Sequence, residues 1–331
     1  MLAWLLDESP GDYRWGEVPD PQPGPGQVRI VPVATALNHM DLWLTRGRPR
    51  PRSLPHVPGA DVAGVVESVG EGVSGVSVGD EVVVNPALVP REALVAGVDS
   101  VLDPTMGILG EHCWGAHGGF CVVDAHQVIP RPPKLSWAEC AAYPIAHSTA
   151  WRLLRRAEVS AGDAVLVTGV GGGVATAAMM LAIHLGAVVS VTSREPRKRN
   201  RALELGATEA FDSEEDWPGG FDVVFDSIGP ATWDQAVGAL RRGGRLCVCG
   251  ATSGTTAELD LPKLFWRQID ILGGSCSSQE EFAQVTTMVD QGAGVVLDRS
   301  YPVHEYPAAL ERLRAGDQLG KVVLEHPPAS P

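Results

Sequence analysis

The sequence predicts an α/β protein with two parts, a β-rich N-terminal region followed by a doubly wound sheet of parallel strands. Residues up to about 125 are rich in Pro, Gly and Val, and short apolar runs alternate there with turn signals. From about Leu135 onward, short strand patterns alternate with helical patterns, which favours a parallel sheet. The chain has 331 residues, 44% of them hydrophobic, which is enough for two domains with full cores.

Taken in order, the N-terminal region contains the strand patterns "QVRIVPVATAL" and "GDEVVVNP", and a helical run, "WAECAAYPIAHSTAWRLLRRA", follows it. The parallel sheet is predicted from five later runs: "AVLVTG", "AVVSVTS", "DVVFDSIG", "RLCVCG" and "IDILGG". After Ser275 the pattern predicts a helix, "SQEEFAQVTTMVDQG", then "RSYPVHEYPAALERLRAG" and a last strand, "GKVVLEH". We expect the tail "PPASP" to be disordered.

The formal net charge of −14 argues against a general affinity for nucleic acid or anionic lipid, because both would repel the molecule as a whole. We therefore expect a small-molecule substrate as the partner. The start of the chain, "MLAWLLDESPGDYRW", has no basic leader before a long apolar segment, which favours the cytoplasm. The six cysteines are spread along the chain, as expected of reduced thiols.

The segment from Val165 to Arg194 is apolar enough to raise the question of a membrane span. Its glycine cluster, "GVGGG", would break a membrane helix, so a strand, a turn and a helix fit better. We predict a strand at Val165–Thr168, a tight turn at Gly169–Gly173 and a helix at Val174–Leu185, whose free N–H groups face a pyrophosphate.

The glycine spacing departs from the G-x-G-x-x-G fingerprint, since Gly169, Gly172 and Ala175 give G-x-x-G-x-x-A. Alanine at the last position still permits close packing of the helix. Because the pattern lies between a strand and a helix, with a second strand after it, it predicts a Rossmann dinucleotide site. We expect Gly169, Gly172, Gly173 and Val174 to contact the cofactor.

The second strand ends in "VTSREPRKRNR", where an acidic residue would be needed to bind a free ribose 2′-hydroxyl. Ser193, Arg194 and Arg197 are suited instead to a 2′-phosphate, which predicts NADP(H) as the cofactor. For Arg199 and Arg201 the simpler interpretation is a solvated start of a helix.

Further cofactor contacts are expected where later strands of the sheet end, because ligands bind at the carboxyl ends of parallel strands. These residues are Ser227, Gly250, Ala251, Thr252, Gly274 and Ser275.

Motifs along nearly the whole chain resemble the medium-chain dehydrogenase/reductase superfamily, which includes zinc alcohol dehydrogenases and zinc-free quinone and enoyl reductases. They are "LNHMDLW", "LPHVPGADVAGVVESVGEGVSGVSVGDEVVV", "VLVTGVGGGV", "FDVVFDSIG" and "GKVVLEH". The resemblance implies a GroES-like β-rich catalytic domain at residues 1–126 and 276–331, with a Rossmann NADP-binding domain at 127–275 between them. It further implies a substrate cleft between the domains, cofactor contacts at Thr149 and Lys321, and a homodimer that pairs "IDILGG".

The sequence departs from this family at the zinc sites. The positions of the catalytic zinc ligands, and of the glutamate beside them, hold Asn38, Ala60, Asp61 and Ile145, and the structural zinc lobe, "NPALVPREALVAGVDSVLDPTMG", contains no cysteine. An alternative cluster in "EHCWGAH" lacks an evident fourth ligand, and packing or hydrogen bonding explains its His and Cys residues more simply. We therefore predict no metal.

Without zinc, ordinary alcohol oxidation is disfavoured, because the positions of the family's proton relay hold Met40 and Trp43. Reduction of a conjugated C=C bond is less demanding, since hydrogen bonds can hold the enolate that forms. The zinc-free relatives place an Asn-x-x-Asp motif at the cleft, which Asn38 and Asp41 match. We expect Asn38 to donate to the substrate oxygen, and Asp41 chiefly to brace the loop.

The proton for the α-carbon has several candidate sources: His39, His147, Tyr143 and solvent. His147 is the preferred candidate, because it closely precedes Thr149, where relatives contact the nicotinamide. A histidine satisfied inside the domain junction is the alternative interpretation.

The sequence thus predicts an NADPH-dependent, zinc-independent oxidoreductase that reduces an activated C=C bond of an enone, enoyl or quinone substrate. A zinc-independent carbonyl or alcohol oxidoreductase and a non-catalytic NADPH-binding protein are the alternatives. The substrate itself is not encoded in a readable motif, because loops such as Arg46–Pro55 shape the pocket.

Overall fold

The computed structural model describes residues 1–94 and 98–327, which form two compact units. Unit 1 comprises residues 1–145 and 276–290 and continues from Leu297, whereas unit 2 comprises residues 146–275 and 291–296. The predicted boundary near residue 126 lies before this division, because helix α2 (Trp137–Ala142) contacts strands β3 and β4 of unit 1. Residues 328–331 of the predicted disordered tail lie outside the described residues.

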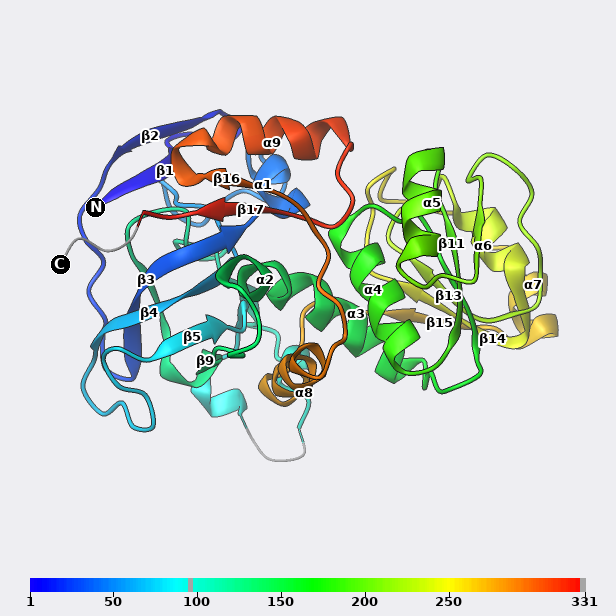
Figure 1. Ribbon diagram of the computed structural model, residues 1–331, viewed down its shortest axis with the longest axis horizontal. Coiled ribbons are helices and arrows are strands. Elements are labelled where there is room, and N and C mark those ends of the chain that lie inside the picture. Colours follow the sequence, from blue (N-terminus) through cyan, green and yellow to red (C-terminus); the bar gives the residue numbers. More distant parts are fainter. Residues whose placement is uncertain (95–97, 328–331) are drawn as a thin grey trace. The chain divides into compact units, whose positions relative to one another are not determined.

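The main sheet of unit 1 has the strand order β16-β17-β3-β4-β5-β9, with β8 also paired to β3, so strands from both ends of the chain share it (Figure 1). Its strands are β3 (Gln27–Ala36), β4 (Asp61–Val69), β5 (Glu81–Val84), β8 (Cys121–Asp124), β9 (Val128–Pro130), β16 (Leu297–Pro302) and β17 (Lys321–Glu325). Two smaller antiparallel pairs are β1 (Leu2–Leu6) with β2 (Tyr13–Glu17), and β6 (Ala87–Leu88) with β7 (Gly107–Ile108).

Burial along β3 alternates from Val28 onward, as expected of a strand with one face on a core. One core cluster of unit 1 includes Val28 and Ile30, and a second includes Leu37, Tyr306 and Leu324. The helices of this unit are α1 (His39–Leu44), α2, α8 (Gln279–Asp290) and α9 (Tyr306–Ala315). This unit is the β-rich part that the sequence predicts.

Unit 2 contains a six-stranded sheet with the order β12-β11-β10-β13-β14-β15, and every pairing in it is parallel. Its strands are β10 (Ala164–Val167), β11 (Val188–Thr192), β12 (Glu209–Phe211), β13 (Phe221–Asp226), β14 (Leu240–Val248) and β15 (Asp270–Gly273). Its helices are α3 (Pro144–Arg156, which starts just before this unit), α4 (Gly173–His184), α5 (Pro196–Glu204), α6 (Trp233–Ala239) and α7 (Leu261–Arg267). The predicted doubly wound parallel sheet is confirmed.

The apolar segment from Val165 folds as β10, a glycine turn, α4 and β11, as predicted, with α4 starting one residue earlier than expected. Within residues 1–94 and 98–327, no helix combines the length and the apolar character needed to cross a bilayer. The strand order turns at β10, which pairs with β11 on one side and β13 on the other. Ligands bind at such a switch point in doubly wound sheets.

Gly59 allows two loops of unit 1 to approach closely at the start of β4. Its φ is +106°, and a Cβ built on it would lie 2.6 Å from Nδ1 and 2.8 Å from the backbone N of His117. The Ala116 N–H donates to the Gly59 carbonyl at 2.9 Å. Any side chain at this position would therefore push against the His117 backbone.

We expect Gly59→Ala to lower the free energy of unfolding by about 3 kcal/mol or more, because steric overlap adds to the strain of a positive φ. Gly72→Ala is the matched control, since Gly72 also has a positive φ (+75°) but a Cβ there would meet nothing within 4 Å. The control should lose only about 1 kcal/mol. Urea unfolding followed by circular dichroism measures both, and equal losses would contradict the steric explanation.

Candidate active site

Asn38 lies between the end of β3 and the start of α1, where it is the N-cap residue of the helix. Its backbone N–H donates to Oδ2 of Asp41 at 2.7 Å. The buried Asp41 carboxylate also accepts from the Tyr306 hydroxyl at 3.2 Å, and the Asp41 carbonyl accepts from the Tyr13 hydroxyl at 2.9 Å. Asp41 thus has the contacts of a brace for this loop, and any further role in catalysis stays a prediction.

The Asn38 side chain belongs to a charged cluster with Asp61 and Lys321. Asn38 Nδ2 donates to Asp61 Oδ2 at 2.9 Å. Lys321 Nζ donates to Asn38 Oδ1 at 2.7 Å, to Asp61 Oδ2 at 2.8 Å and to the Leu37 carbonyl at 2.7 Å. The other Asp61 oxygen accepts from the Ile145 N–H at 2.8 Å. The structure therefore brings together three of the positions that the resemblance assigns to the zinc site, with an ammonium group among them.

The ion pair in this cluster is almost fully enclosed, since the Lys321 side chain is 5% exposed and that of Asp61 is 0% exposed. Buried charges persist only when they are paired and hydrogen-bonded, and removal of one partner of such a pair costs roughly 3–5 kcal/mol. Sequence reasoning placed Lys321 near the cofactor and did not predict this pair. The only sequence signal was an isolated lysine in an otherwise apolar strand, "GKVVL".

A second polar chain in unit 1 runs from His117 to the C-terminal end of β17. His117 Nδ1 is 3.0 Å from Thr35 Oγ1, and that hydroxyl is 3.1 Å from His326 Nε2. Burial, with a smaller effect of His117, lowers the pKa of His326 to about 3. His117 Nε2 lies 3.5 Å from Asp41 Oδ1. His117 is therefore a hydrogen-bonding core residue, which is the simpler of the two interpretations of "EHCWGAH".

His39 follows Asn38 directly and is half-buried in unit 1. Burial first, and the positive charge of Lys321 second, lower its pKa below the usual value of a histidine. The Tyr143 hydroxyl is 2.9 Å from Thr286 Oγ1. His147 and Thr149 lie in α3 and are buried, and His147 Nε2 is 3.2 Å from the Gly294 carbonyl. That contact is what a structural histidine would make, and a catalytic role for His147 stays a prediction.

In unit 2 the glycine turn leads from β10 into the first turn of α4. Gly169 has φ +64°, and a Cβ there would lie 2.6 Å from Ile228 Cδ1. A Cβ on Gly172, the N-cap residue, would meet nothing within 4 Å, so the space beside the helix start is open. The first N–H groups of a helix have no partner within it and attract anions. Gly169, Gly172, Gly173 and Val174 form this turn and helix start, and their contact with a pyrophosphate stays a prediction.

The basic cluster after β11 separates into paired and unpaired side chains. Lys198 and Arg197 lie 2.7 and 3.6 Å from Glu195 carboxylate oxygens. Arg199 donates to Asp212 Oδ2 at 2.7 Å and to the Ser193 carbonyl at 2.6 Å. Arg201 lies 2.7 Å from a Glu204 oxygen.

Arg194 is exposed and forms no ion pair with any described residue. Ser193 Oγ accepts from the Glu195 N–H at 3.2 Å, which fixes the start of the loop. Ser193 is buried and Arg194 is exposed, and their contact with a phosphate stays a prediction.

Asp226, which the sequence analysis did not single out, organises the ends of β10 and β13. Its buried carboxylate accepts from the hydroxyls of Thr168 and Thr232 at 2.6 Å each, and from the Gly229 N–H at 2.7 Å. The sequence signal was an aspartate at the end of an apolar strand, in "FDVVFDSIG". Asp226 thereby holds the loop that contains Ser227.

The remaining predicted cofactor residues follow β14 and β15. Thr252 Oγ1 donates to the Ser227 carbonyl at 3.2 Å, and a Cβ on Gly250 would lie 2.2 Å from that same oxygen. Ala251 and Ser275 are exposed, and the Gly274 N–H donates to the Val248 carbonyl at 3.1 Å. The structure brings Ser227, Gly250 and Thr252 together, but it does not test whether any of these residues binds a cofactor.

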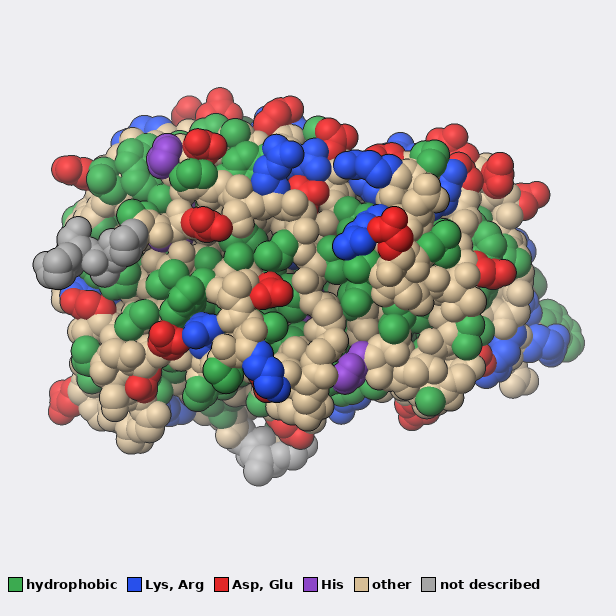
Figure 2. Space-filling model, in the orientation of Figure 1, with side chains coloured by type: hydrophobic (Ala, Val, Ile, Leu, Met, Phe, Trp, Pro, Cys, Tyr) green, Lys and Arg blue, Asp and Glu red, His purple; other side chains and the backbone are tan. Residues whose placement is uncertain are grey.

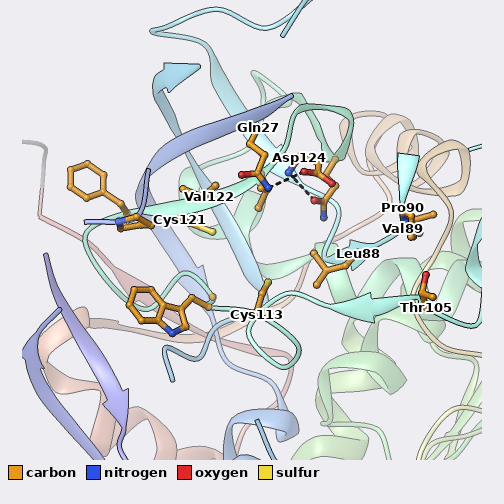
Figure 3. A pocket seen from close by; sticks show the side chains of 15 residues that line it. Gln27, Leu88, Val89, Pro90, Thr105, Cys113, Cys121, Val122 and Asp124 are labelled. Carbon is orange, nitrogen blue, oxygen red and sulfur yellow. Dashed lines mark hydrogen bonds between the residues drawn. The ribbon is translucent and has the colours of Figure 1, made fainter. Parts of the chain in front are cut away.

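A pocket of about 450 Å³ lies elsewhere in unit 1, lined by Leu88, Cys113, Cys121, Asp124 and others (Figure 3). Gln27 Nε2 donates to Asp124 Oδ1 at 3.1 Å on its wall. None of the residues predicted for catalysis or cofactor binding lines it. It therefore adds nothing to the candidate active site.

Two family models match the chain: the alcohol dehydrogenase GroES-like domain over residues 24–133 and the zinc-binding dehydrogenase over residues 173–291. A zinc-type alcohol dehydrogenase-like protein of Schizosaccharomyces pombe is 32% identical, over 91% of this chain and 91% of its own length. The crotonyl-CoA reductase of Streptomyces collinus is 28% identical, over 92% of this chain and 80% of its own length.

Solved structures of other proteins have the same fold as this chain. An NAD-dependent alcohol dehydrogenase superposes with a TM-score of 0.92 at 36% identity, over 98% of this chain and 99% of its own. A 2-octenoyl-CoA carboxylase reductase, solved with NADP and 2-octenoyl-CoA, has a TM-score of 0.92 at 26% identity, over 99% of this chain and 88% of its own. The predicted GroES-like and Rossmann folds are thereby confirmed.

The zinc that the second family model names does not fit the residues at the matching positions. Lys321 Nζ already lies against oxygens of Asn38 and Asp61, and its positive charge would repel a metal bound there. Catalytic zinc also needs three Cys, His or carboxylate ligands. Within residues 1–94 and 98–327, no three His, Cys, Asp or Glu side chains are placed to hold a metal.

This chain differs from the zinc-binding members of the family in its metal ligands and not in its fold. Both family models match in the expected order, and the similarity to a full-length relative extends over nine-tenths of the chain. The chain belongs to the medium-chain dehydrogenase/reductase superfamily.

Proposed function

We propose that this chain is an NADPH-dependent, zinc-independent reductase of a C=C bond conjugated to a carbonyl group, as in enones, enoyl thioesters and quinones. The observation that carries the proposal is the Asn38–Asp61–Lys321 cluster at the positions of the family's zinc site. The cluster offers a hydrogen-bond donor to a reacting oxygen but no Lewis acid. The likeness to a crotonyl-CoA reductase and to a 2-octenoyl-CoA carboxylase reductase supports the same class of reaction.

The chemistry needs a donor at the substrate oxygen and a proton for the α-carbon. When bound, NADPH supplies the hydride that the β-carbon receives. As the π bond breaks, its electron pair moves toward the carbonyl oxygen, where the Asn38 amide stabilises the enolate by hydrogen bonding. A proton from His147, His39 or water then forms the second C–H bond at the α-carbon. This step completes the reduction without a metal.

Reduction of a simple carbonyl is the second candidate, because a solved relative is an alcohol dehydrogenase. That reaction needs a proton for the alkoxide oxygen. The relay positions hold Met40, whose thioether carries no acidic proton, and Trp43, whose indole does not titrate near neutral pH, so neither side chain passes a proton. A protein that binds NADPH without turnover is the third candidate.

Metal-free protein, verified by elemental analysis, should oxidise NADPH with a conjugated alkene and form the saturated carbonyl product. Asn38→Ala should lower kcat about 100-fold, the usual effect of removing an oxyanion donor. Asn200→Ala, on the exposed face of α5, is the control and should match the wild type. Product analysis over quinones, enones, enoyl thioesters, aldehydes and ketones decides the class. Turnover of carbonyls alone, or only after zinc addition, would overturn the proposal.

The proposed preference for NADPH rests on Ser193 and on Arg194, the one arginine of the predicted set that pairs with no acidic side chain among the described residues. A 2′-phosphate would receive charge-assisted hydrogen bonds from the Arg194 guanidinium. Glu195 is engaged by Lys198 at 2.7 Å, which reduces its repulsion of a phosphate.

Arg194→Ala should raise the KM for NADPH about tenfold and leave the KM for NADH unchanged, because only NADPH has the extra phosphate. Arg201→Ala is the matched control, since Arg201 is paired with Glu204 on the same helix. Steady-state kinetics with both coenzymes measures the effect. An equal rise for both would mean that Arg194 does not recognise the phosphate.

We infer that a second copy of this chain covers the edge of unit 2 at β15. β15 is the last strand in the sheet order. The helix before it in the chain, α7, contacts β14 and exposes Leu261, Phe265 and Trp266, which are 60%, 59% and 69% exposed, and hydrophobic side chains protrude at that end in Figure 2. An unpaired strand edge with neighbouring apolar side chains is suited to association with another chain. A homodimer would pair the two β15 strands.

Sedimentation should give twice the chain mass of 35.0 kDa for the wild type, and Trp266→Asp should shift the protein toward the monomer. Leu102→Asp tests for a general effect of adding charge to an exposed apolar position, because Leu102 is 74% exposed in unit 1. It should leave the mass unchanged. A monomeric wild type would refute this assembly.

The charge and the cysteines of the chain bear on its binding partner and on its cellular compartment. Acidic and basic side chains are mixed over the face shown in Figure 2, and the net charge is −14, which supports a small-molecule substrate over nucleic acid. No disulfide joins cysteines within the described residues, which supports a reducing compartment, and we propose the cytoplasm.

A further inference from the structure

We propose that Lys321 and Asp61 are positioning residues that fix the Asn38 amide with its NH₂ group available to the substrate oxygen. The inference rests on the proposed function, because it assigns a task to the same site. Lys321 then acts through Asn38 and not on the cofactor.

The two charges allow only one orientation of the amide. The ammonium group of Lys321 donates to Asn38 Oδ1 at 2.7 Å, and the carboxylate of Asp61 accepts from Asn38 Nδ2 at 2.9 Å. If the amide rotated by half a turn, NH₂ would face the ammonium group and the carbonyl oxygen would face the carboxylate. Both contacts would then be repulsive. The assignment of nitrogen and oxygen in this side chain therefore follows from its charged neighbours.

The neighbouring contacts fix the cluster in place. The Asn38 N–H is held by Asp41 at 2.7 Å, and the second oxygen of Asp61 is held by the Ile145 N–H at 2.8 Å. Among the described residues, one Nδ2 hydrogen of Asn38 is left without an acceptor. Asn38 is half-buried, whereas both charged partners are buried, so Asn38 is the least buried residue of the cluster.

Lys321 has no donor left for a coenzyme phosphate. An ammonium group has three N–H bonds, and these match its three acceptors: the Leu37 carbonyl, Asn38 Oδ1 and Asp61 Oδ2. All three acceptors belong to unit 1. Lys321 can therefore be tested for two roles, as a ligand of the cofactor or as the residue that positions the Asn38 amide. The two roles predict different kinetic changes when Lys321 is replaced.

The first test compares Lys321→Met with the wild type. We expect kcat at saturating NADPH to fall about 10- to 100-fold, and the Kd for NADPH, from fluorescence titration, to stay within twofold. Arg312→Met is the matched control. It breaks another ion pair of unit 1, in which Arg312 lies 2.9 Å from Asp298, and kcat should stay within twofold. A tenfold rise in the Kd for NADPH with unchanged kcat would make Lys321 a cofactor ligand and overturn the proposal.

The second test needs neither substrate nor turnover. The Asn38 side-chain NH₂ resonances in a ¹⁵N-labelled protein are assigned by their loss in Asn38→Ala. Lys321→Met should shift these resonances and accelerate their exchange with water, whereas Arg312→Met should leave them in place. Unchanged resonances would refute the positioning role. Because this measurement is independent of catalysis, a failure of the proposed reaction remains distinguishable from a failure of this inference.

Removal of one buried charge can prevent folding, so a double variant completes the design. Asp61→Asn with Lys321→Met removes both charges at once and leaves no unpaired ion. It should show the same loss of kcat and the same change in the Asn38 resonances. A double variant with wild-type kcat and wild-type resonances would contradict the proposal.

Discussion

The buried ion pair of Lys321 with Asp61 is the interaction on which the candidate active site depends. It joins residues 260 positions apart, and both partners lie on strands of one sheet. β17 reaches Asp61 only because it pairs with β3, where Val323 lies opposite Ala36, while β3 pairs with β4. A shift of β17 by one residue would turn the lysine side chain to the other face. The apolar residues of β17 that fix this register therefore also fix the site.

Unit 2 also contains a buried carboxylate, that of Asp226, which is stabilised without an ion pair to any described residue. Asp226 collects two hydroxyl donors and one backbone N–H, so its charge needs no cationic partner. The loops after β10 and β13 are thereby held together at the place where a doubly wound sheet binds its ligand. In both units a buried carboxylate holds the loops next to the candidate site.

The sequence predicts local features well, and it misses pairings between distant residues. Strand, glycine turn and helix from Val165 onward are found as predicted, because adjacent residues encode them. The Lys321–Asp61 pair has no such signal, because nothing near either residue in the sequence indicates a partner 260 positions away. The unit boundary at residue 145 depends on how α2 packs against β3 and β4, which no composition change reveals. Likewise, the partners of His117 and His147 become visible only in three dimensions.

The discontinuous course of unit 1 also has a consequence for biosynthesis. Its first 145 residues leave the ribosome long before β16 and β17, and the whole of unit 2 is made in between. Until β17 arrives, the end of β3 at Ala34–Ala36 lacks the strand that pairs with it there, and Asp61 lacks the ammonium group of Lys321. Unit 2 can complete its own sheet during this interval, since domains generally fold as they emerge. While unit 2 is being synthesised, the main sheet of unit 1 therefore lacks β16 and β17. Cellular chaperones would bind unit 1 in this incomplete state.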